Sequence, residues 1–584
     1  MTPHATPPHD PASPGATPCG TEPTTRRITV RYAAGSGGSG PLTRGQANMV
    51  LCIRGDAPER INRESVWPVP DGVSVPSGLV ALRLLVERHE SLRTSFPAGP
   101  GPDGFPDRQV VHGHGRFAVT VVQASGRSAE ELDALAADLG RTDVALPVPL
   151  DAPPRARFTM VADGERLLRL VAVVCHAGAD GGATAVLIQD WYALAAGKEL
   201  PPVTALTPLR VAVAEQGVQG RRRAAAALRH WARILTTGPQ VVFADARITG
   251  PPRDHSALLV RSRSAAEHLA AVCRRTGASP SVVLLAAFAA LVAHRSGRPE
   301  LVLSALSANR QRAALFDHVG TLAQDALILL DTGTADLDQL IGRAKSASLS
   351  AYWHSTLDAQ RVWQLVDDAA HVRGSRFSRQ VVVNDLSLTV PAVVADVRPA
   401  PALDPELTAL PAPPLPVRLM LTVLRITDSL DFVLVACPQV LDPEETEGFA
   451  RALPALLAAA ADGPVPLSGL PAGLGPPDGG REGDWRLVDG ARIDLAAVRR
   501  LLQAALGDHE LSVRDGRLAV ELSCDDPGFG PAEAHRAVIA ALPGRDTAMA
   551  PHHYTVRHAT PAGERSAAGD GRDPAVVARL SALT

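Results

Sequence analysis

A histidine, an aspartate and two glycines lie between two apolar runs in the stretch CHAGADGG, residues 175–182. His176 ends the first run, Asp180 follows four residues later, and Gly181 and Gly182 precede the second run. A histidine with a pKa near neutrality can take a proton from an attacking group or hold that group in place, work worth about 10²–10⁴-fold as general base catalysis. We therefore interpret His176 as the candidate catalytic residue. The alternative is a histidine that only satisfies hydrogen bonds in the core.

Apolar patterning predicts the elements that position this stretch. Residues 155–176 predict two strands joined by an Asp-Gly turn, the second strand being buried, and residues 183–197 predict a helix that ends near Gly197. His176 would then lie at the C-terminal end of a buried strand. Neighbouring residues of a strand point to opposite faces, so the Cys175 thiol should face away from His176 and serve packing. A nucleophilic Cys175 is the alternative.

The rest of the chain alternates between helical and strand patterns, which predicts an α/β fold. Helical patterns occur at 79–86, in an Arg-rich connector at 216–231 and as two helices within 264–298, and strand patterns lie within 300–311 and 378–388. The glycines of 35–40 formally satisfy GxGxxG, but Pro41 follows where a phosphate-binding helix needs free N–H groups. We interpret this segment as a flexible joint.

Composition excludes several function classes. Hydrophobic residues make up 46% of the 584 residues and the net charge is −3, so the basic excess that nucleic-acid binding requires is missing. The six cysteines show neither paired spacing nor companion histidines at metal-ligand intervals, which favours a reduced, cytoplasmic chain without a metal site. The Pro- and Thr-rich residues 1–26 lack the apolar core of a signal peptide, and the longest apolar run, 281–293, is too short to cross a bilayer.

Five further motifs accompany CHAGADGG in a fixed order. They are PLTRGQANM at 41–49, RHESLRTSF at 88–96, SANRQ at 307–311, HVGTLAQDALIL at 318–329 and VVVND at 381–385. Together they resemble the condensation domains of nonribosomal peptide synthetases, members of the chloramphenicol-acetyltransferase-like superfamily, over about residues 27–470. The resemblance implies two similar lobes, each a sheet flanked by helices, that form a V-shaped pseudo-dimer. A tunnel would run between the lobes with His176 at its middle.

The resemblance also implies roles for the residues around His176. Asp180 is a rival for the base, but its tight loop indicates a buried carboxylate that needs a cation, and by resemblance this cation is Arg310. Gly181 would supply a backbone conformation that a side chain forbids. A slender pantetheine arm would pass small residues here, and the implied tunnel residues are Cys175, Gly178, Gly182, Gln324 and Asn384.

Several positions depart from the family. Cys175 replaces the first histidine of the HHxxxDG motif, Gln324 stands where asparagine is usual, and Gly182 replaces a larger residue. We expect the small Gly182 to widen the acceptor side. The charged residues Arg88, His89 and Arg93 are interpreted as groups at a helix end that bond locally and serve the fold.

The last hundred residues resemble another family. WRLVDGARIDLAAVRRLL is similar to the start of the small C-terminal subdomain of adenylation domains, and LPGRDTAMAPHHYTVRHATPAGERSA is similar to its end. The lysine that the family uses to contact the acyl-adenylate aligns with Glu564, and no lysine follows Lys345. An anion in place of that cation inverts the electrostatics, so we predict that this α+β module does not adenylate and serves for docking or as a brace.

The expected organisation is a disordered lead at 1–26, an N-lobe at 27–205, a C-lobe at 206–470, a linker at 471–484 and the module at 485–584. The implied function is that of a free-standing condensation enzyme of antibiotic or other natural-product biosynthesis, which forms an amide from a carrier-bound acyl thioester and an amine. Carrier proteins would act in trans and present substrate on their phosphopantetheine arm; the acceptor would be a small-molecule or carrier-bound amine. No bound cofactor, metal, nucleic acid or membrane is expected. A hydroxyl acceptor that gives an ester, or a non-catalytic docking platform, remains the alternative.

Overall fold

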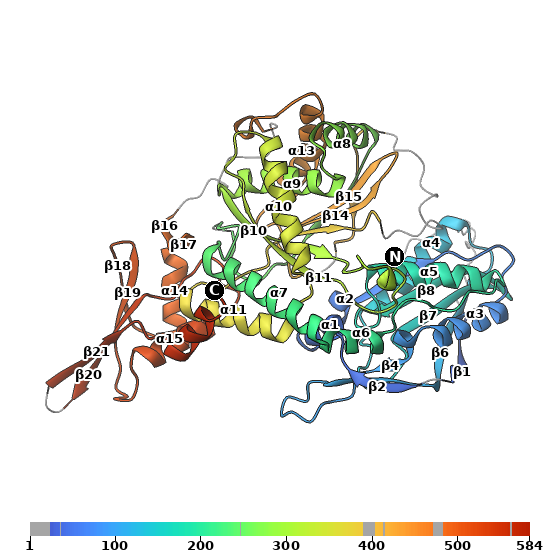
Figure 1. Cartoon of the computed structure of the whole chain (residues 1–584), viewed down its shortest axis with the longest axis horizontal. Coiled ribbons are helices and arrows are strands. Elements are labelled where there is room, and N and C mark those ends of the chain that lie inside the picture. The colour runs from blue at the N-terminus through green and yellow to red at the C-terminus, as the bar shows by residue number, and fades with distance from the viewer. Residues whose placement is uncertain are drawn as a thin grey trace, which may run out of the picture.

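The computed structural model describes residues 24–35, 37–245, 247–388, 403–412, 415–470, 483–560 and 563–584. Figure 1 shows three parts in succession along the long axis: a five-stranded sheet with its helices, a seven-stranded sheet with its helices, and a small C-terminal unit. Helices and strands alternate in all three, so the α/β prediction is confirmed.

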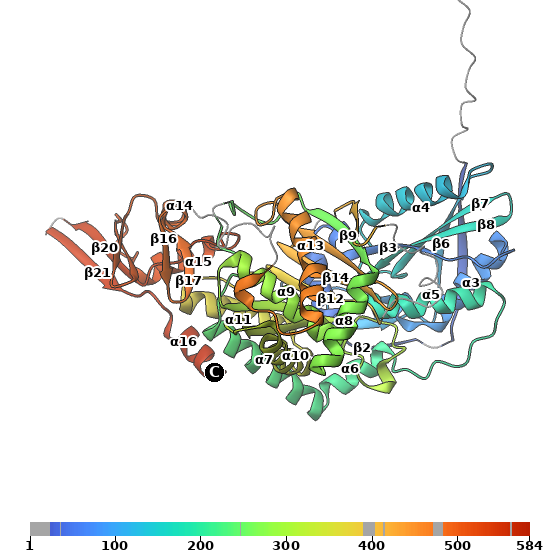
Figure 2. The ribbon, with the colours of Figure 1, turned by 90° about the horizontal axis from the view of Figure 1, so that it is seen from above.

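The N-lobe contains a five-stranded sheet with helices on both faces. Its strand order is β1 (Thr25–Ala33), β6 (His114–Gln123), β7 (Ala156–Asp163), β8 (Arg166–Cys175) and β3 (Asn62–Trp67). Figure 2 shows α4 (Ala129–Val144) on one face, and α3 (Val75–Arg88) and α5 (Gly181–Ala195) on the other. Strand β8 is buried on both faces, which explains its continuous apolar run. The predicted hairpin is present, because β7 and β8 pair antiparallel around Asp163 and Gly164.

Smaller elements complete this lobe. The helices are α1 (Arg44–Gly55), α2 (Pro58–Ile61) and the 3-10 turn Glu90–Arg93, and β2 (Gly38–Pro41), β5 (Arg108–Val111) and β4 (Thr94–Ser95) form a three-stranded sheet. The predicted flexible joint is wrong in part, because Gly38–Pro41 pair with Arg108–Val111. Of the predicted disordered lead, residues 1–23 lie outside the described residues, whereas Thr25 and Arg26 belong to β1 and pair with β6.

The C-lobe contains a seven-stranded mixed sheet. Its order is β11 (Gln324–Asp331), β10 (Glu300–Ser307), β12 (Val381–Asp385), β14 (Leu419–Ile426), β15 (Leu430–Ala436), β9 (Ser256–Ser262) and β13 (Glu406–Leu410). Alternate residues of β10 point to the two opposite faces of this sheet. Leu301 and Leu303 pack with one helical layer, α8 (Arg263–Thr276), α9 (Pro280–Ser296), α10 (Leu337–Trp353) and α13 (Pro443–Ala461). Val302 packs with α7 (Val218–Thr237) and α11 (Ala359–Arg373) on the other face of the sheet.

The chain passes from the N-lobe to the C-lobe through α6 (Pro208–Gln216). Within the C-lobe, a 3-10 turn at Ala313–Leu315 lies between β10 and β11. In the described part of the chain no single helix is long and apolar enough to span a membrane, although α8 and α9 pass such a test when taken together across a 103° bend.

The C-terminal unit has its own apolar core. A hairpin of β16 (Trp485–Val488) and β17 (Ala491–Asp494) leads into α14 (Leu495–Leu506). A four-stranded sheet follows, β18 (Glu510–Arg514), β19 (Arg517–Ser523), β20 (His553–Thr560) and β21 (Gly563–Gly569), with α15 (Pro531–Ala541) beside it. The last helix, α16 (Pro574–Ser581), packs on α11 of the C-lobe through Leu580. Most of the predicted linker, residues 471–482, lies outside the described residues.

Candidate active site

His176 directly follows the last residue of β8, as predicted, and its side chain is half-buried. Its Nδ1 is buried and has no hydrogen-bond partner among the described residues. Burial lowers the pKa of His176 below its ordinary value, the positive charge of Arg63 lowers it further, and the nearby carboxylate of Asp180 opposes both. The lowered pKa leaves the ring neutral at neutral pH, which is the form that accepts a proton.

Asp180 is buried and caps helix α5. Its Oδ1 accepts a hydrogen bond from the backbone N–H of Ala183 at 2.9 Å, as an N-cap residue does. Its Oδ2 accepts from the backbone N–H groups of Leu322 and Ala323, at 2.8 and 2.9 Å. The carboxylate therefore binds the N-lobe helix and a C-lobe segment at once.

Arg310 completes the surroundings of Asp180. Its two terminal nitrogens donate to the two carboxylate oxygens at 2.9 and 2.7 Å, so the predicted ion pair is present and bidentate. Burial alone would raise the pKa of Asp180, but the charge and hydrogen bonds of Arg310 and the backbone donors outweigh it, and the pKa is lowered. Asp180 is therefore a permanently charged anchor between the lobes.

The motif PLTRGQANM contributes a close contact to this junction. Thr43 and Gln46 form a capping box at the start of α1. A Cβ on Gly45 would lie 2.0 Å from the carbonyl oxygen of Thr321, so only glycine lets α1 approach the segment that binds Asp180.

Two small residues that we placed in the tunnel face side chains instead of open space. A Cβ on Gly182 would lie 3.0 Å from Cζ of Arg310, so the missing side chain makes room for the guanidinium. The expectation that Gly182 widens the acceptor side is corrected accordingly. A Cβ on Gly178 would lie 2.6 Å from Cβ of Arg155, which fills that space, and the Gly178 carbonyl accepts a hydrogen bond from Ser91.

Two larger tunnel candidates are also occupied by structural contacts. Cys175 is 1% exposed and packs with Val50 and Phe96, which fits the predicted packing role of the thiol and removes it from the tunnel lining. The side-chain amide of Gln324 donates to the backbone carbonyl of Leu357 and accepts from its N–H, both at 3.0 Å. Gln324 therefore fixes the segment before α11, and its assignment to the tunnel is corrected.

The remaining two assignments have different outcomes. Gly181 is the first residue of α5 and does not have a positive φ, so the predicted special backbone conformation is wrong. A Cβ at this position would meet only Leu386, at 3.6 Å. Asn384 lies half-buried near the end of β12, where its side chain makes no hydrogen bond within the described part of the chain, and it stays a candidate for contact with substrate.

The charged residues of RHESLRTSF serve the fold, but through distant partners. Nε of Arg88 and Nε2 of His89 both bond Oδ2 of Asp190 on α5 at 2.8 Å, and Arg93 donates to the carbonyl of His112. The prediction of purely local bonding is therefore wrong, because α5 supplies the partner of Arg88 and His89, and the residue after β5 supplies that of Arg93.

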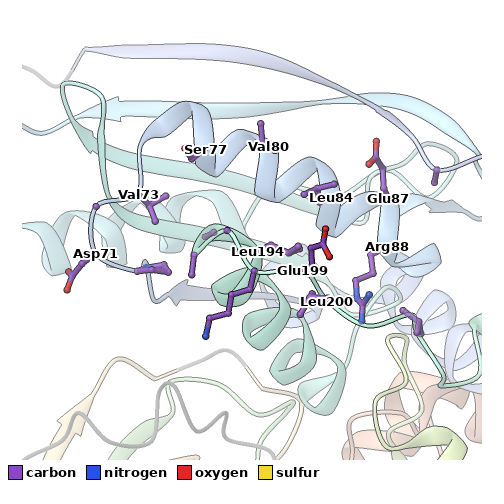
Figure 3. A pocket seen from close by; sticks show the side chains of 18 of the residues that line it. Asp71, Val73, Ser77, Val80, Leu84, Glu87, Arg88, Leu194, Glu199 and Leu200 are labelled. Atoms are coloured by element: carbon purple, nitrogen blue, oxygen red, sulfur yellow. The ribbon is translucent and has the colours of Figure 1, made fainter.

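A separate hollow of about 1300 Å³ lies between α3 and the segment that follows α5 (Figure 3). Val80, Leu84 and Glu199 line it, and Arg88 marks its end toward the helix terminus. None of the predicted site residues borders this hollow, so it is separate from His176.

Comparisons with known proteins agree with this architecture. The condensation-domain family model matches residues 76–391. Isonitrile lipopeptide synthase of Mycobacterium tuberculosis is 27% identical over 286 residues, which are 46% of this chain and 11% of that protein. Phosphinothricin tripeptide synthetase PhsC of Streptomyces viridochromogenes is 29% identical over 340 residues, 56% of this chain and 30% of that protein. The chain thus spans a small part of these curated relatives.

Solved structures share the fold. The first condensation domain of the CDA synthetase has a TM-score of 0.55 and 18% identity, and the match covers 74% of this chain and 99% of that one. An X-domain from teicoplanin biosynthesis, solved in complex with OxyB, has a TM-score of 0.55 and 22% identity, with coverage of 74% and 95%.

Proposed function

This chain belongs to the condensation-domain family, and we propose that it joins a carrier-bound acyl group to an acceptor amine, with His176 as the catalytic residue. The acceptor nitrogen attacks the thioester carbonyl carbon, the C–N bond forms and the C–S bond breaks. His176 takes the proton that the nitrogen loses, and the departing pantetheine sulfur receives it. An α-amino group has a pKa of about 7.7–8.0 and is partly neutral in the cell, so holding it at the thioester contributes alongside proton transfer.

The observation that carries this proposal is the division of roles between His176 and Asp180. His176 is neutral, half-buried and free of a hydrogen bond at Nδ1 within the described part of the chain. Both oxygens of Asp180 are occupied by five hydrogen bonds from Ala183, Leu322, Ala323 and Arg310, and its pKa is lowered. This supports His176 as the base over its carboxylate rival.

The proposal is tested by intact-protein mass spectrometry. A carrier protein loaded with an acyl group is mixed with the chain and with a panel of free and carrier-bound amines and alcohols. We expect acyl transfer to an amine, reduced about 10²–10⁴-fold in His176→Ala. His553→Ala, at an exposed histidine of the C-terminal unit, is the matched control. Equal transfer by wild type and His176→Ala would contradict the proposal, and transfer to alcohols alone would establish the ester-forming alternative.

The C-terminal unit acts, in this proposal, as a brace on the C-lobe. Asp546 accepts hydrogen bonds from Arg418 at 3.0 and 3.1 Å and from Gln380 at 2.7 Å. Arg418 is 1% exposed, and Gln380 directly precedes β12. The position where adenylation domains need a cation is the exposed Glu564. We expect no amino acid-dependent ATP–pyrophosphate exchange, and measurable exchange would contradict this part.

A docking platform is the second candidate function. The teicoplanin X-domain of the same fold was solved in complex with another protein, OxyB. Carrier proteins that bind the chain without any His176-dependent transfer, under the conditions of the mass spectrometry experiment, would favour this candidate.

A further inference from the structure

Arg63 lies beside His176 on the neighbouring strand. It is the second residue of β3 and is paired with Val174 of β8, two residues before His176. The preceding residue, Asn62, points to the α4 face of the sheet, where its amide bonds the carbonyls of Val144 and Leu146 at 3.1 and 2.9 Å. Because strand residues alternate between faces, the Arg63 side chain points to the opposite face, the one that Val174 shares. Side chains diagonal to each other across two strands are about 7–8 Å apart, within reach of an arginine.

The guanidinium of Arg63 is accessible but unpaired. The residue is exposed to solvent, and the desolvation of its guanidinium by surrounding protein lowers its pKa, with the charge of Glu64 opposing this. Its positive charge also acts on the imidazole, because it lowers the pKa of His176. No ion pair or side-chain hydrogen bond of Arg63 exists within the residues that the structure describes. Arg310 and Arg155, by contrast, are bonded to Asp180 and to backbone carbonyls.

We propose that Arg63 binds the carboxylate of a free α-amino acid acceptor while His176 acts on the amine of the same molecule. A guanidinium presents a planar fork of donors that matches a carboxylate. In an α-amino acid the amine and the carboxylate are separated by one carbon. Two neighbouring side chains, His176 as the base and Arg63 as the cation, can therefore bind the amine and the carboxylate of one molecule. A carrier-bound aminoacyl acceptor has no such carboxylate, because it is a thioester.

This inference rests on the proposed function and specifies its acceptor. The amino acid nitrogen forms the new C–N bond, its proton passes through His176 to the departing thiol, and the products are an N-acyl amino acid with a free carboxylate and the unloaded carrier. Arg63 is a specificity-determining residue in this scheme. It takes no proton and forms no covalent bond.

The test compares acceptors that differ only at the carboxylate. Acyl-loaded carrier protein is incubated with alanine, alaninamide or the N-acetylcysteamine thioester of alanine, and kcat/KM is measured for wild type, Arg63→Met and Arg63→Lys. Hydrogen bonds to charged groups correspond to an affinity change of about 10- to 100-fold. We expect wild type to prefer alanine, the alanine-to-alaninamide ratio to fall by about 10- to 100-fold in Arg63→Met, mainly through KM, and Arg63→Lys to recover part of it.

The other outcomes separate this inference from the function on which it rests. His176-dependent transfer to the thioester or alaninamide but not to alanine would overturn the inference and leave the proposed function intact. An unchanged alanine-to-alaninamide ratio in Arg63→Met would overturn it as well, because Arg63 would then be structural. If no acceptor reacts with wild type, the proposed function fails and the inference fails with it.

Discussion

Replacing Asp180 by alanine should destabilise the junction of the two lobes. The substitution removes the N-cap of α5, the acceptors of the Leu322 and Ala323 N–H groups, and the partner of Arg310. The side chains of Asp180 and Arg310 are 1% and 10% exposed, so the remaining guanidinium would be a nearly buried, unpaired charge.

The expected magnitude follows from that burial. Breaking a buried pair by removing one partner costs about 3–5 kcal/mol, and a lost N-cap costs about 1 kcal/mol more. For a folded unit of about 150–250 residues, a loss of about 4–6 kcal/mol lowers Tm by roughly 8–24 °C. Because the pKa of Asp180 is lowered below 3.8, its contribution is complete above pH 3.8 and is lost only as the pH falls through the lowered value. The destabilisation should therefore be the same at about pH 7 and about pH 5.

Scanning calorimetry of the first unfolding transition measures this loss. Asp138→Ala is the matched control, since Asp138 and Arg141 form a surface pair with side chains 68% and 54% exposed. A surface pair contributes less than about 1 kcal/mol. The double variant Asp180→Ala with Arg310→Met leaves no buried charge, so it should lose about 1–3 kcal/mol less than the sum of the two single variants.

Two results would refute the reasoning about Asp180. One is a Tm of Asp180→Ala as close to wild type as that of Asp138→Ala. The other is strict additivity of Asp180→Ala and Arg310→Met, which would show that the two charges do not depend on each other.

Three further predictions concern the same junction and the C-terminal unit. Since the pKa of His176 is lowered from 6.5, its proton-accepting form is complete above pH 6.5, so kcat/KM calculated for the neutral amine alone should keep its plateau down to about pH 6.5 and fall only below it. Gly182→Ala should lower the free energy of unfolding, measured by thermal unfolding, by about 1–3 kcal/mol, because its Cβ would lie 3.0 Å from Arg310. Gly181→Ala, whose Cβ would meet one carbon at 3.6 Å, should lower it by less than about 0.5 kcal/mol. Asp546→Ala, which removes the ion-pair partner of the buried Arg418, should loosen the contact of the C-terminal unit with the C-lobe and speed limited proteolysis between them.

The sequence by itself determined the strand that leads to His176 and the buried state of Asp180. The apolar run before His176 predicted a buried strand that ends at the histidine, and β8 ends one residue before it. The Gly-flanked loop around Asp180 predicted a buried carboxylate in need of a cation, and Arg310 is that cation. These predictions were confirmed because they depend on local periodicity and on the free-energy cost of burying an unpaired charge. Both effects are independent of how the rest of the chain folds.

The tertiary structure alone decided what surrounds each small or polar residue. Glycines at 178 and 182 are equally small in the sequence, but Arg155 and Arg310, which come from elsewhere in the chain, fill the space beside them. Gln324 could equally have faced substrate, and only the fold places Leu357 where it satisfies the amide.

The position of Arg63 next to His176 also could not be predicted from the sequence. In the sequence it is one arginine among many, and only the pairing of β3 with β8 places it next to His176. Strand register and lobe packing bring together residues that lie more than a hundred positions apart, and no local pattern encodes such a contact. The position of His176 at the end of a buried strand is therefore predictable from its own neighbourhood, whereas the residues that surround its side chain come from the fold.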